Sequence, residues 1–240
     1  MRWTGFGWAV LAAGLAWSLV PARGEGTHGV ADVIDEAALR TQVAAGLELV
    51  KAAKGAAALA IFDEVDRNFA EAHASGPRVF CAHGPTEAAL YMLKSASDGG
   101  ADAVAINGLW CDAIYYKAYT LTDLGRPADA EKELDRVLKM APDNSLYLNE
   151  RAELATRAHQ YDQAIAIYKL AESDSPYMVG DDSIRAVKSR ACRGVGYILT
   201  QEGKLDESKA EYRRCLTIDA NDQKSKDELA YIAQLRARKK

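Results

Sequence analysis

Small and bulky apolar residues follow one another along the second half of this chain in an order that occurs three times. Two small residues stand 12 positions apart, a bulky residue follows after 4, a small or β-branched one after 3, and the copy closes after 5 more. The copies begin at positions 118, 152 and 196, so the first two are 34 residues apart and the last two 44. The three sets are Ala118, Ala130, Leu134, Val137 and Pro142; Ala152, Ala164, Tyr168, Ala171 and Pro176; and Gly196, Ser208, Tyr212, Cys215 and Ala220.

Each copy predicts two antiparallel helices. In the first copy Ile114, Ala118 and Leu121 recur at i, i+4 and i+7, which places them on one helix face. Gly125 can end that helix, and Pro127 suits the first turn of the next one. Small residues at equivalent places let the two helices approach closely, and the bulky residue fills the remaining space.

This spacing, the 34-residue period and the closing proline resemble the tetratricopeptide repeat. The resemblance covers repeats at 111–144, 145–178 and 189–222. It implies an all-α fold, a right-handed solenoid of antiparallel helix hairpins. A composition rich in Ala, Leu, Glu, Lys and Arg also favours helices.

The copies depart from the family pattern at several positions. Ile114, Leu148 and Cys192 stand where the family has a large aromatic residue near the start of the first helix. The third copy has Ser208 in place of alanine and Ala220 in place of the proline.

The segments flanking the repeats follow the pattern less closely. We expect 25–110 to hold a degenerate helix hairpin and a short inserted helix, with a loop at 75–85 and a further helix from about Ala101 into the first repeat. Residues 223–240 predict a helix that covers the last hairpin, because a solenoid otherwise exposes an apolar end.

The first 24 residues have the layout of a secretory signal. Arg2 precedes the apolar stretch from Phe6 to Val20, and Ala22 and Gly24 supply small residues for cleavage after Gly24. The alternative is an uncleaved membrane anchor, but a helix of this stretch is shorter than the roughly 30 Å hydrocarbon core. The sequence therefore predicts a periplasmic or secreted protein, with membrane contact only if the signal is retained.

The charge of the chain argues against nucleic acid as a partner. The formal net charge is −4, and removal of Arg2 and Arg23 with the signal gives −4 − 2 = −6. Nucleic-acid binding requires a basic surface, and the basic cluster at the C-terminus suits the end of a helix.

Four cysteines remain in the exported chain, and export permits disulfides. Cys192 and Cys215 lie at equal distances from the turn around Gly203, so they should face each other across the third hairpin. The remaining pair, Cys81 with Cys111, follows by elimination. The alternative for the first pair is two small core residues in the thiol form.

No motif for catalysis, nucleotide binding or a cofactor occurs in the sequence. The alternative function is an enzyme of the hydrolase or thiol-redox type. Its site would be the segment "VFCAHGP", in which Cys81 and His83 lie close together. A metal site is not expected, because this segment offers too few converging ligands.

The first helices of stacked hairpins line a concave surface, and the resemblance implies that this surface holds an extended peptide. Residues about 100° from the core positions should face it. We therefore predict a peptide-binding face and a non-catalytic interaction scaffold, which could serve the assembly of an envelope or secretion complex; the oligomeric state is left open. The candidate residues are Tyr115, Tyr119, Asn149, Glu153, Arg190, Arg193 and Tyr197.

Overall fold

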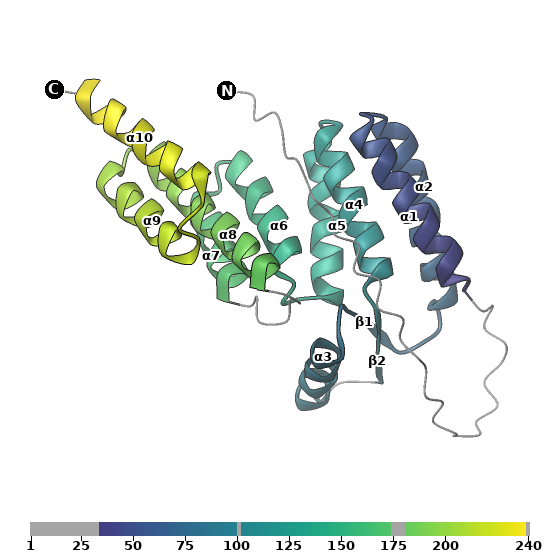
Figure 1. The fold of residues 1–240 in the computed structure, drawn as a ribbon. Coiled ribbons are helices and arrows are strands. Elements are labelled where there is room, and N and C mark those ends of the chain that lie inside the picture. The colour runs from purple at the N-terminus through teal and green to yellow at the C-terminus, as the bar shows by residue number, and fades with distance from the viewer. Residues whose placement is uncertain (1–33, 100–101, 174–180, 239–240) are drawn as a thin grey trace. The chain divides into compact units, whose positions relative to one another are not determined.

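A computed structural model describes residues 34–99, 102–173 and 181–238, and the expected signal segment lies outside them. Most described residues are helical, and the helices come in antiparallel pairs (Figure 1). The expected all-α solenoid of helix hairpins is confirmed. The elements are α1 Glu36–Lys51, α2 Gly55–Ala72, β1 Arg78–Ala82, α3 Pro85–Ser97, β2 Ala103–Asn107, α4 Leu109–Asp123, α5 Pro127–Met140, α6 Ser145–Arg157, α7 Tyr161–Ser173, α8 Asp181–Gln201, α9 Leu205–Ile218 and α10 Gln223–Arg238.

Three helix pairs, α4 with α5, α6 with α7 and α8 with α9, correspond to the three sequence copies. The turn of each pair contains one residue in the left-handed backbone region: Gly125 at φ 73°, His159 at φ 59° and Gly203 at φ 73°. Glycine takes this conformation without steric cost, and histidine is among the residues that tolerate it. His159 therefore has a turn role equivalent to that of the two glycines.

In the third helix pair a polar residue, Ser208, occupies a position that is alanine in the other two copies, and its hydroxyl forms hydrogen bonds. Ser208 is fully buried, and its hydroxyl donates to the carbonyl oxygen of Gly196 across the hairpin at 2.9 Å. The Thr200 hydroxyl lies 2.7 Å from the same oxygen atom of Ser208. A buried hydroxyl with these partners avoids the cost of an unmade hydrogen bond, so Ser208 can replace the alanine of the other copies.

Two glycines of α8 receive tyrosine rings from the helices on either side. A Cβ atom at Gly194 would overlap the ring of Tyr168 from α7. A Cβ atom at Gly196 would lie 2.9 Å from Cζ of Tyr212 from α9. Both tyrosines are buried, so neither ring has room to move away. Because Gly194 and Gly196 have no side chain, α7 and α9 can approach α8 closely at these positions.

The segment between α2 and α4 differs from the expectation. Two five-residue strands, β1 and β2, pair in parallel and are joined by α3. The predicted loop at 75–85 and the predicted helix from Ala101 were therefore wrong in part. A parallel pair is formed between residues far apart in the chain, and such non-local contacts outweigh the helix preference of the alanines in β2.

This βαβ insertion is attached to the hairpins by specific contacts. The Cys81–Cys111 disulfide joins β1 to the first turn of α4. The Asn107 side-chain amide donates to Glu36 at the start of α1 at 2.5 Å. The insertion is therefore fixed to the helices on both sides of it.

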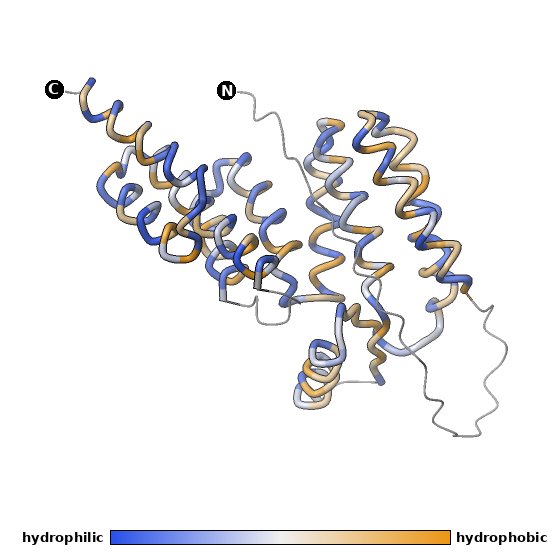
Figure 2. Tube along the Cα trace, viewed as in Figure 1, coloured by the Kyte–Doolittle hydropathy of each residue, from blue (hydrophilic) through white to orange (hydrophobic). Residues whose placement is uncertain are grey.

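The buried apolar side chains form three clusters along the stack. Figure 2 shows that hydrophobic and hydrophilic residues alternate along the helices. The expected N-terminal hairpin is present as α1 and α2, with Ala58, Phe62 and Val65 fully buried and Leu49 partly buried. In the third pair the core includes the Cys192–Cys215 disulfide. Both expected bridges are thus present. The third repeat was predicted to begin at position 189, but its first helix, α8, begins eight residues earlier, at Asp181.

The Cys192–Cys215 bridge closes a loop with a sequence separation of 23 residues. We expect the double substitution Cys192→Ser and Cys215→Ser to lower the free energy of unfolding by about 3 kcal/mol, because the unfolded chain gains the freedom that the bridge removes. Urea denaturation under non-reducing conditions measures this difference. An unchanged denaturation midpoint would show that the bridge does not stabilise this hairpin.

Candidate functional site: the face of the first helices

The first helices of the repeats, α4, α6 and α8, present one row of equivalent half-buried side chains. Tyr119, Glu153 and Tyr197 each follow directly after the small residue of the hairpin contact, so they point about 100° away from it. A further step of 34 residues leads from Tyr197 to Tyr231 on α10, which is 41% exposed. We call this surface, on α4, α6, α8 and α10, the first-helix face.

Ion pairs between neighbouring elements hold the arginines of this face. Arg190 of α8 donates to Glu150 of α6 at 2.8 Å, and Glu150 is almost fully buried. Burial lowers the pKa of Arg190, but the carboxylate of Glu150 more than offsets this, so the guanidinium stays charged. Arg193 donates to Asp222, just before α10, at 2.8 Å. These side chains therefore have fixed positions before any ligand arrives.

Two of the predicted face residues lie inside the structure. Tyr115 is 2% exposed and its ring lies 5.1 Å from that of Tyr147. Asn149 is 0% exposed and donates to the carbonyl oxygens of Ser145 and, across to α8, Val187. In this conformation both contribute to helix packing and cannot contact a ligand, because neighbouring helices cover them.

Three further residues, which the sequence reasoning missed, lie beside this face: Asp123, Lys224 and Glu228. The buried Glu150 lies beneath it. Burial raises the pKa of Asp123, and Glu150 raises it further. Burial lowers the pKa of Lys224, as does the positive charge of Arg193. Lys224 follows Arg190 by one repeat length of 34 residues, so the sequence could have predicted that α10 contributes to this face.

The face therefore combines tyrosines with charges of both signs. The row contributes hydroxyl groups from Tyr119 and Tyr197. Burial is the main cause that raises the pKa of both, and nearby acidic or phenolic groups raise it further. Glu153 accepts from Arg157 at 3.1 Å and from the Tyr168 hydroxyl at 3.3 Å. Such a surface offers aromatic contact and hydrogen bonds to a peptide, but it holds no activated nucleophile.

His83 lies where the βαβ insertion meets α4 and α6. Its Nε2 atom is 3.0 Å from Asp112 of α4, and Asp112 also accepts from the Tyr147 hydroxyl of α6 at 2.8 Å. Its Nδ1 atom is 3.6 Å from Glu87 of α3. The ring is therefore held between two carboxylates that come from different elements.

These carboxylates determine the charge of the imidazole. Burial lowers the pKa of His83, but Asp112 and then Glu87 raise it to about 10. The imidazole is consequently charged near neutral pH and cannot serve as a general base. Cys81 is bonded to Cys111, so the segment predicted as the alternative enzyme site offers neither a free thiol nor a neutral imidazole.

The described residues contain one cluster with metal-ligand geometry, Cys192, Glu211 and Cys215. Its two sulfur atoms are joined in the disulfide, so they cannot act as thiolate ligands. Among the same residues, no helix has the length and apolar character needed to cross a bilayer.

Comparison with known proteins agrees with this architecture. The family model of the tetratricopeptide repeat matches residues 112–144 and 190–222, within one residue of the first and third copies. Pseudomonas aeruginosa PilF is similar in structure, with 15% identity, 85% of this chain and 71% of that chain covered, and a TM-score of 0.57. MamA (residues 41 to the end) from Desulfovibrio magneticus RS-1 has 14% identity, 83% and 85% coverage, and a TM-score of 0.52. No curated protein sequence matches the chain.

The His83 cluster makes the stability of the protein depend on pH. Because the folded pKa of about 10 exceeds the ordinary value of 6.5, the contribution is complete below pH 6.5 and is lost as the pH rises through 10. We expect the difference in unfolding free energy between the wild type and His83→Gln to shrink across this range. Urea denaturation at several pH values measures it, and the exposed control Arg40→Gln should give a constant difference. A constant difference for His83→Gln as well would mean that His83 is not held as an imidazolium.

Proposed function

We propose that this tetratricopeptide repeat protein is a non-catalytic scaffold that holds a segment of another protein on its first-helix face. The observation that supports this most directly is the continuous row of Tyr119, Glu153 and Tyr197 on three successive repeats. Equivalent positions at regular intervals suit an extended segment, which also repeats at regular intervals.

The energetics of binding favour such a surface. Tyrosine gives a large contact area with few rotatable bonds, and it is common among residues that dominate binding. Arg190 and Arg193 are already fixed by Glu150 and Asp222, so binding does not have to order them. The face therefore combines low ordering cost with both donors and acceptors.

The proposed location is the periplasm or the outside of the cell, reached by a signal that is cleaved after Gly24. The apolar stretch from Phe6 to Val20 supports this, and so does the use of all four cysteines in two disulfides, which persist in oxidising compartments. A scaffold in this location could assemble an envelope or secretion complex.

The double variant Tyr119→Ala and Tyr197→Ala tests the binding face. We expect a partner captured from an envelope extract, and then purified, to bind this variant about tenfold more weakly, because two aromatic contacts are removed. Isothermal titration calorimetry with the purified partner measures the change. The control is Leu93→Ala with Leu170→Ala, two exposed side chains on α3 and α7 that lie off the face. Equal binding by both variants would place the binding site elsewhere.

Cell fractionation with N-terminal sequencing tests the location. We expect the protein in the exported fraction, with Glu25 as its first residue. A protein that retains Met1 and sediments with membranes would instead support the uncleaved anchor.

A further inference from the structure

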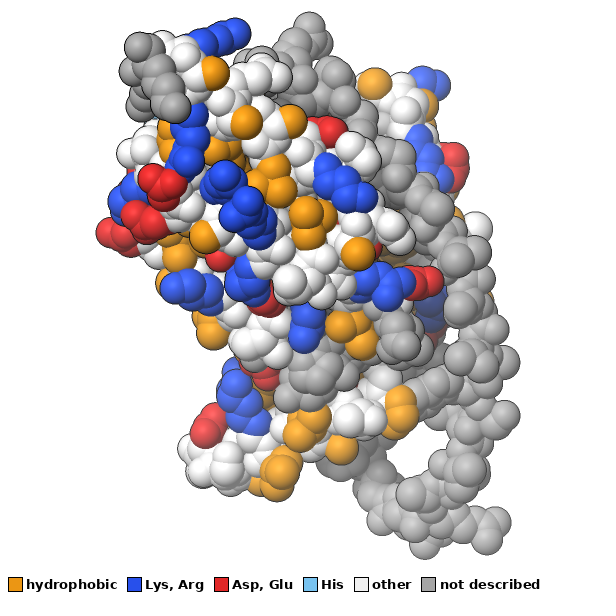
Figure 3. All heavy atoms as spheres, turned by 60° about the vertical axis from the view of Figure 1, so that its left-hand side comes forward, with side chains coloured by type: hydrophobic (Ala, Val, Ile, Leu, Met, Phe, Trp, Pro, Cys, Tyr) orange, Lys and Arg blue, Asp and Glu red, His pale blue; other side chains and the backbone are white. Residues whose placement is uncertain are grey.

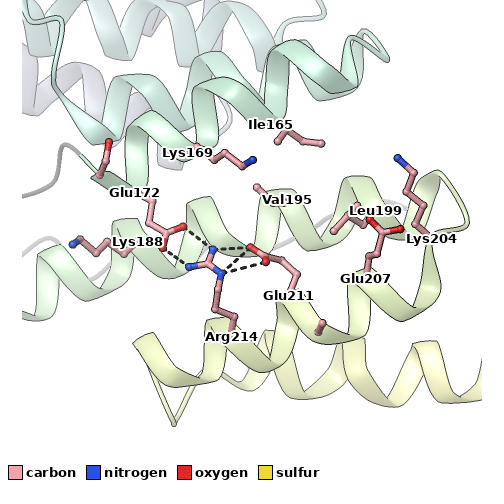
Figure 4. A pocket seen from close by; sticks show the side chains of 12 residues that line it. Ile165, Lys169, Glu172, Lys188, Val195, Leu199, Lys204, Glu207, Glu211 and Arg214 are labelled. Atoms are coloured by element: carbon pink, nitrogen blue, oxygen red, sulfur yellow. Dashed lines mark hydrogen bonds and ion pairs between the residues drawn. The ribbon is translucent and has the colours of Figure 1, made fainter.

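A groove lies between α7 and α9, over α8, on the opposite side of α8 from the first-helix face. Its volume is about 900 Å³ (Figure 4). The apolar floor consists of Ile165 from α7, Val195 and Leu199 from α8, and Ala210 from α9. Because Val195 and Leu199 are one helical turn apart, the floor presents an apolar strip along the axis of α8.

The groove exists because of the two tyrosine–glycine contacts. Gly194 and Gly196 flank Val195, and each residue along a helix turns by about 100°. The rings of Tyr168 and Tyr212 therefore hold α7 and α9 on either side of Val195. The two helices lie on either side of the floor, and Val195 is 7% exposed.

The lining of the groove contains four cations, Lys169, Lys188, Lys204 and Arg214, and three acids, Glu172, Glu207 and Glu211. Lys204 also pairs with Glu202 at 3.1 Å. Arg214 is neutralised by Glu172 at 2.5 Å and Glu211 at 2.6 Å (Figure 4). Lys169 and Lys188 form no ion pair with any described residue. In Figure 4 Lys188 lies toward one end of the groove, Lys204 lies at the other, and Lys169 lies between them.

On the face drawn in Figure 3, lysine and arginine side chains predominate over acidic ones, with small apolar areas between them. The whole chain is acidic, with a net charge of −4. Two lysines that have no ion pair among the described residues, Lys169 and Lys188, beside an apolar strip are therefore a distinct feature.

We propose that this groove is a second docking surface, which binds an acidic amphipathic segment of a partner protein. Two aliphatic side chains of the segment lie on Val195 and Leu199, and its carboxylates pair with Lys169 and Lys188. Complementary charge favours this occupant over a basic or neutral one, since it supplies the counter-charges that the described protein lacks. The surface is separate from the first-helix face, so the protein can hold two segments at once.

A labelled peptide tests this directly. The probe has two leucines one helical turn apart and glutamates at the other positions, and the matched control peptide has lysines in place of the glutamates. Fluorescence anisotropy with the purified protein measures binding. We expect the acidic peptide to bind, the basic peptide not to bind, and added salt to weaken binding by screening the ion pairs.

Protein variants locate the site. Lys169→Glu with Lys188→Glu should weaken binding of the acidic peptide by about tenfold or more, because attraction becomes repulsion. Lys209→Glu with Arg213→Glu makes the same change in net charge on α9 outside the groove and should have little effect. Ala210→Phe should fill the groove and also weaken binding, whereas Ala230→Phe on α10 should not. Circular dichroism and urea denaturation confirm that each variant is folded.

The outcomes separate this proposal from the first. Loss of binding in both groove variants, with Tyr119→Ala and Tyr197→Ala unaffected, supports the groove. Loss only in the first-helix variant would overturn it and place the acidic segment on that face. Equal binding by all folded variants, no binding of the acidic peptide, or reversible self-association through the groove in analytical ultracentrifugation would each overturn it as well.

Discussion

The contact of tyrosine rings with helix backbone is the constraint on which the C-terminal half of the structure depends. Tyr168 and Tyr212 can lie against α8 only because positions 194 and 196 have no side chain. A buried ring packed on a glycine comes close to the helix backbone, and a larger residue would occupy that space. Since the two glycines are separated by one residue, they fix α7 and α9 on two sides of the same helix.

The same geometry gives α8 two different surfaces. Residues two positions apart on a helix point about 200° away from each other, so Arg193 and Tyr197 face one side while Val195 faces the other. The first side carries paired arginines and tyrosines, and the second is an apolar strip beside the charged side chains that line the groove. One helix thus separates a face on which Arg190 and Arg193 are paired from a groove beside which Lys169 and Lys188 form no ion pair with a described residue. Their chemistry differs enough that the two surfaces should select different segments.

The predictability of these features from sequence depends on how local they are. The hairpins and the Cys192–Cys215 bridge could be predicted because each involves residues within one repeat, where the turn at Gly203 fixes which residues face each other. The strands could not be predicted, because β1 and β2 are short and each is a strand only in contact with the other. The burial of Tyr115 and Asn149 has a similar cause. A helical projection gives the direction of a side chain, but not that Tyr147 or the backbone of α8 covers it. The groove was also invisible to this reasoning, since three helices contribute to it.

The covalent and charged links of the insertion complete the physical picture. The insertion adds little core of its own, and a parallel pair of strands is seldom stable without cover on both faces. Here α3 packs on the strands, the Cys81–Cys111 bridge fixes β1 to α4, and His83 connects the insertion through Asp112 to Tyr147 of α6. Asp112 lies on α4 and Tyr147 on α6, the first helices of the first two repeats. The insertion therefore links α4 to α6 at one end of the first-helix face. At the other end, the Cys192–Cys215 bridge ties α8 to α9. A face that is held rigidly at both ends loses less conformational entropy when a ligand binds, so these links suit the proposed scaffold.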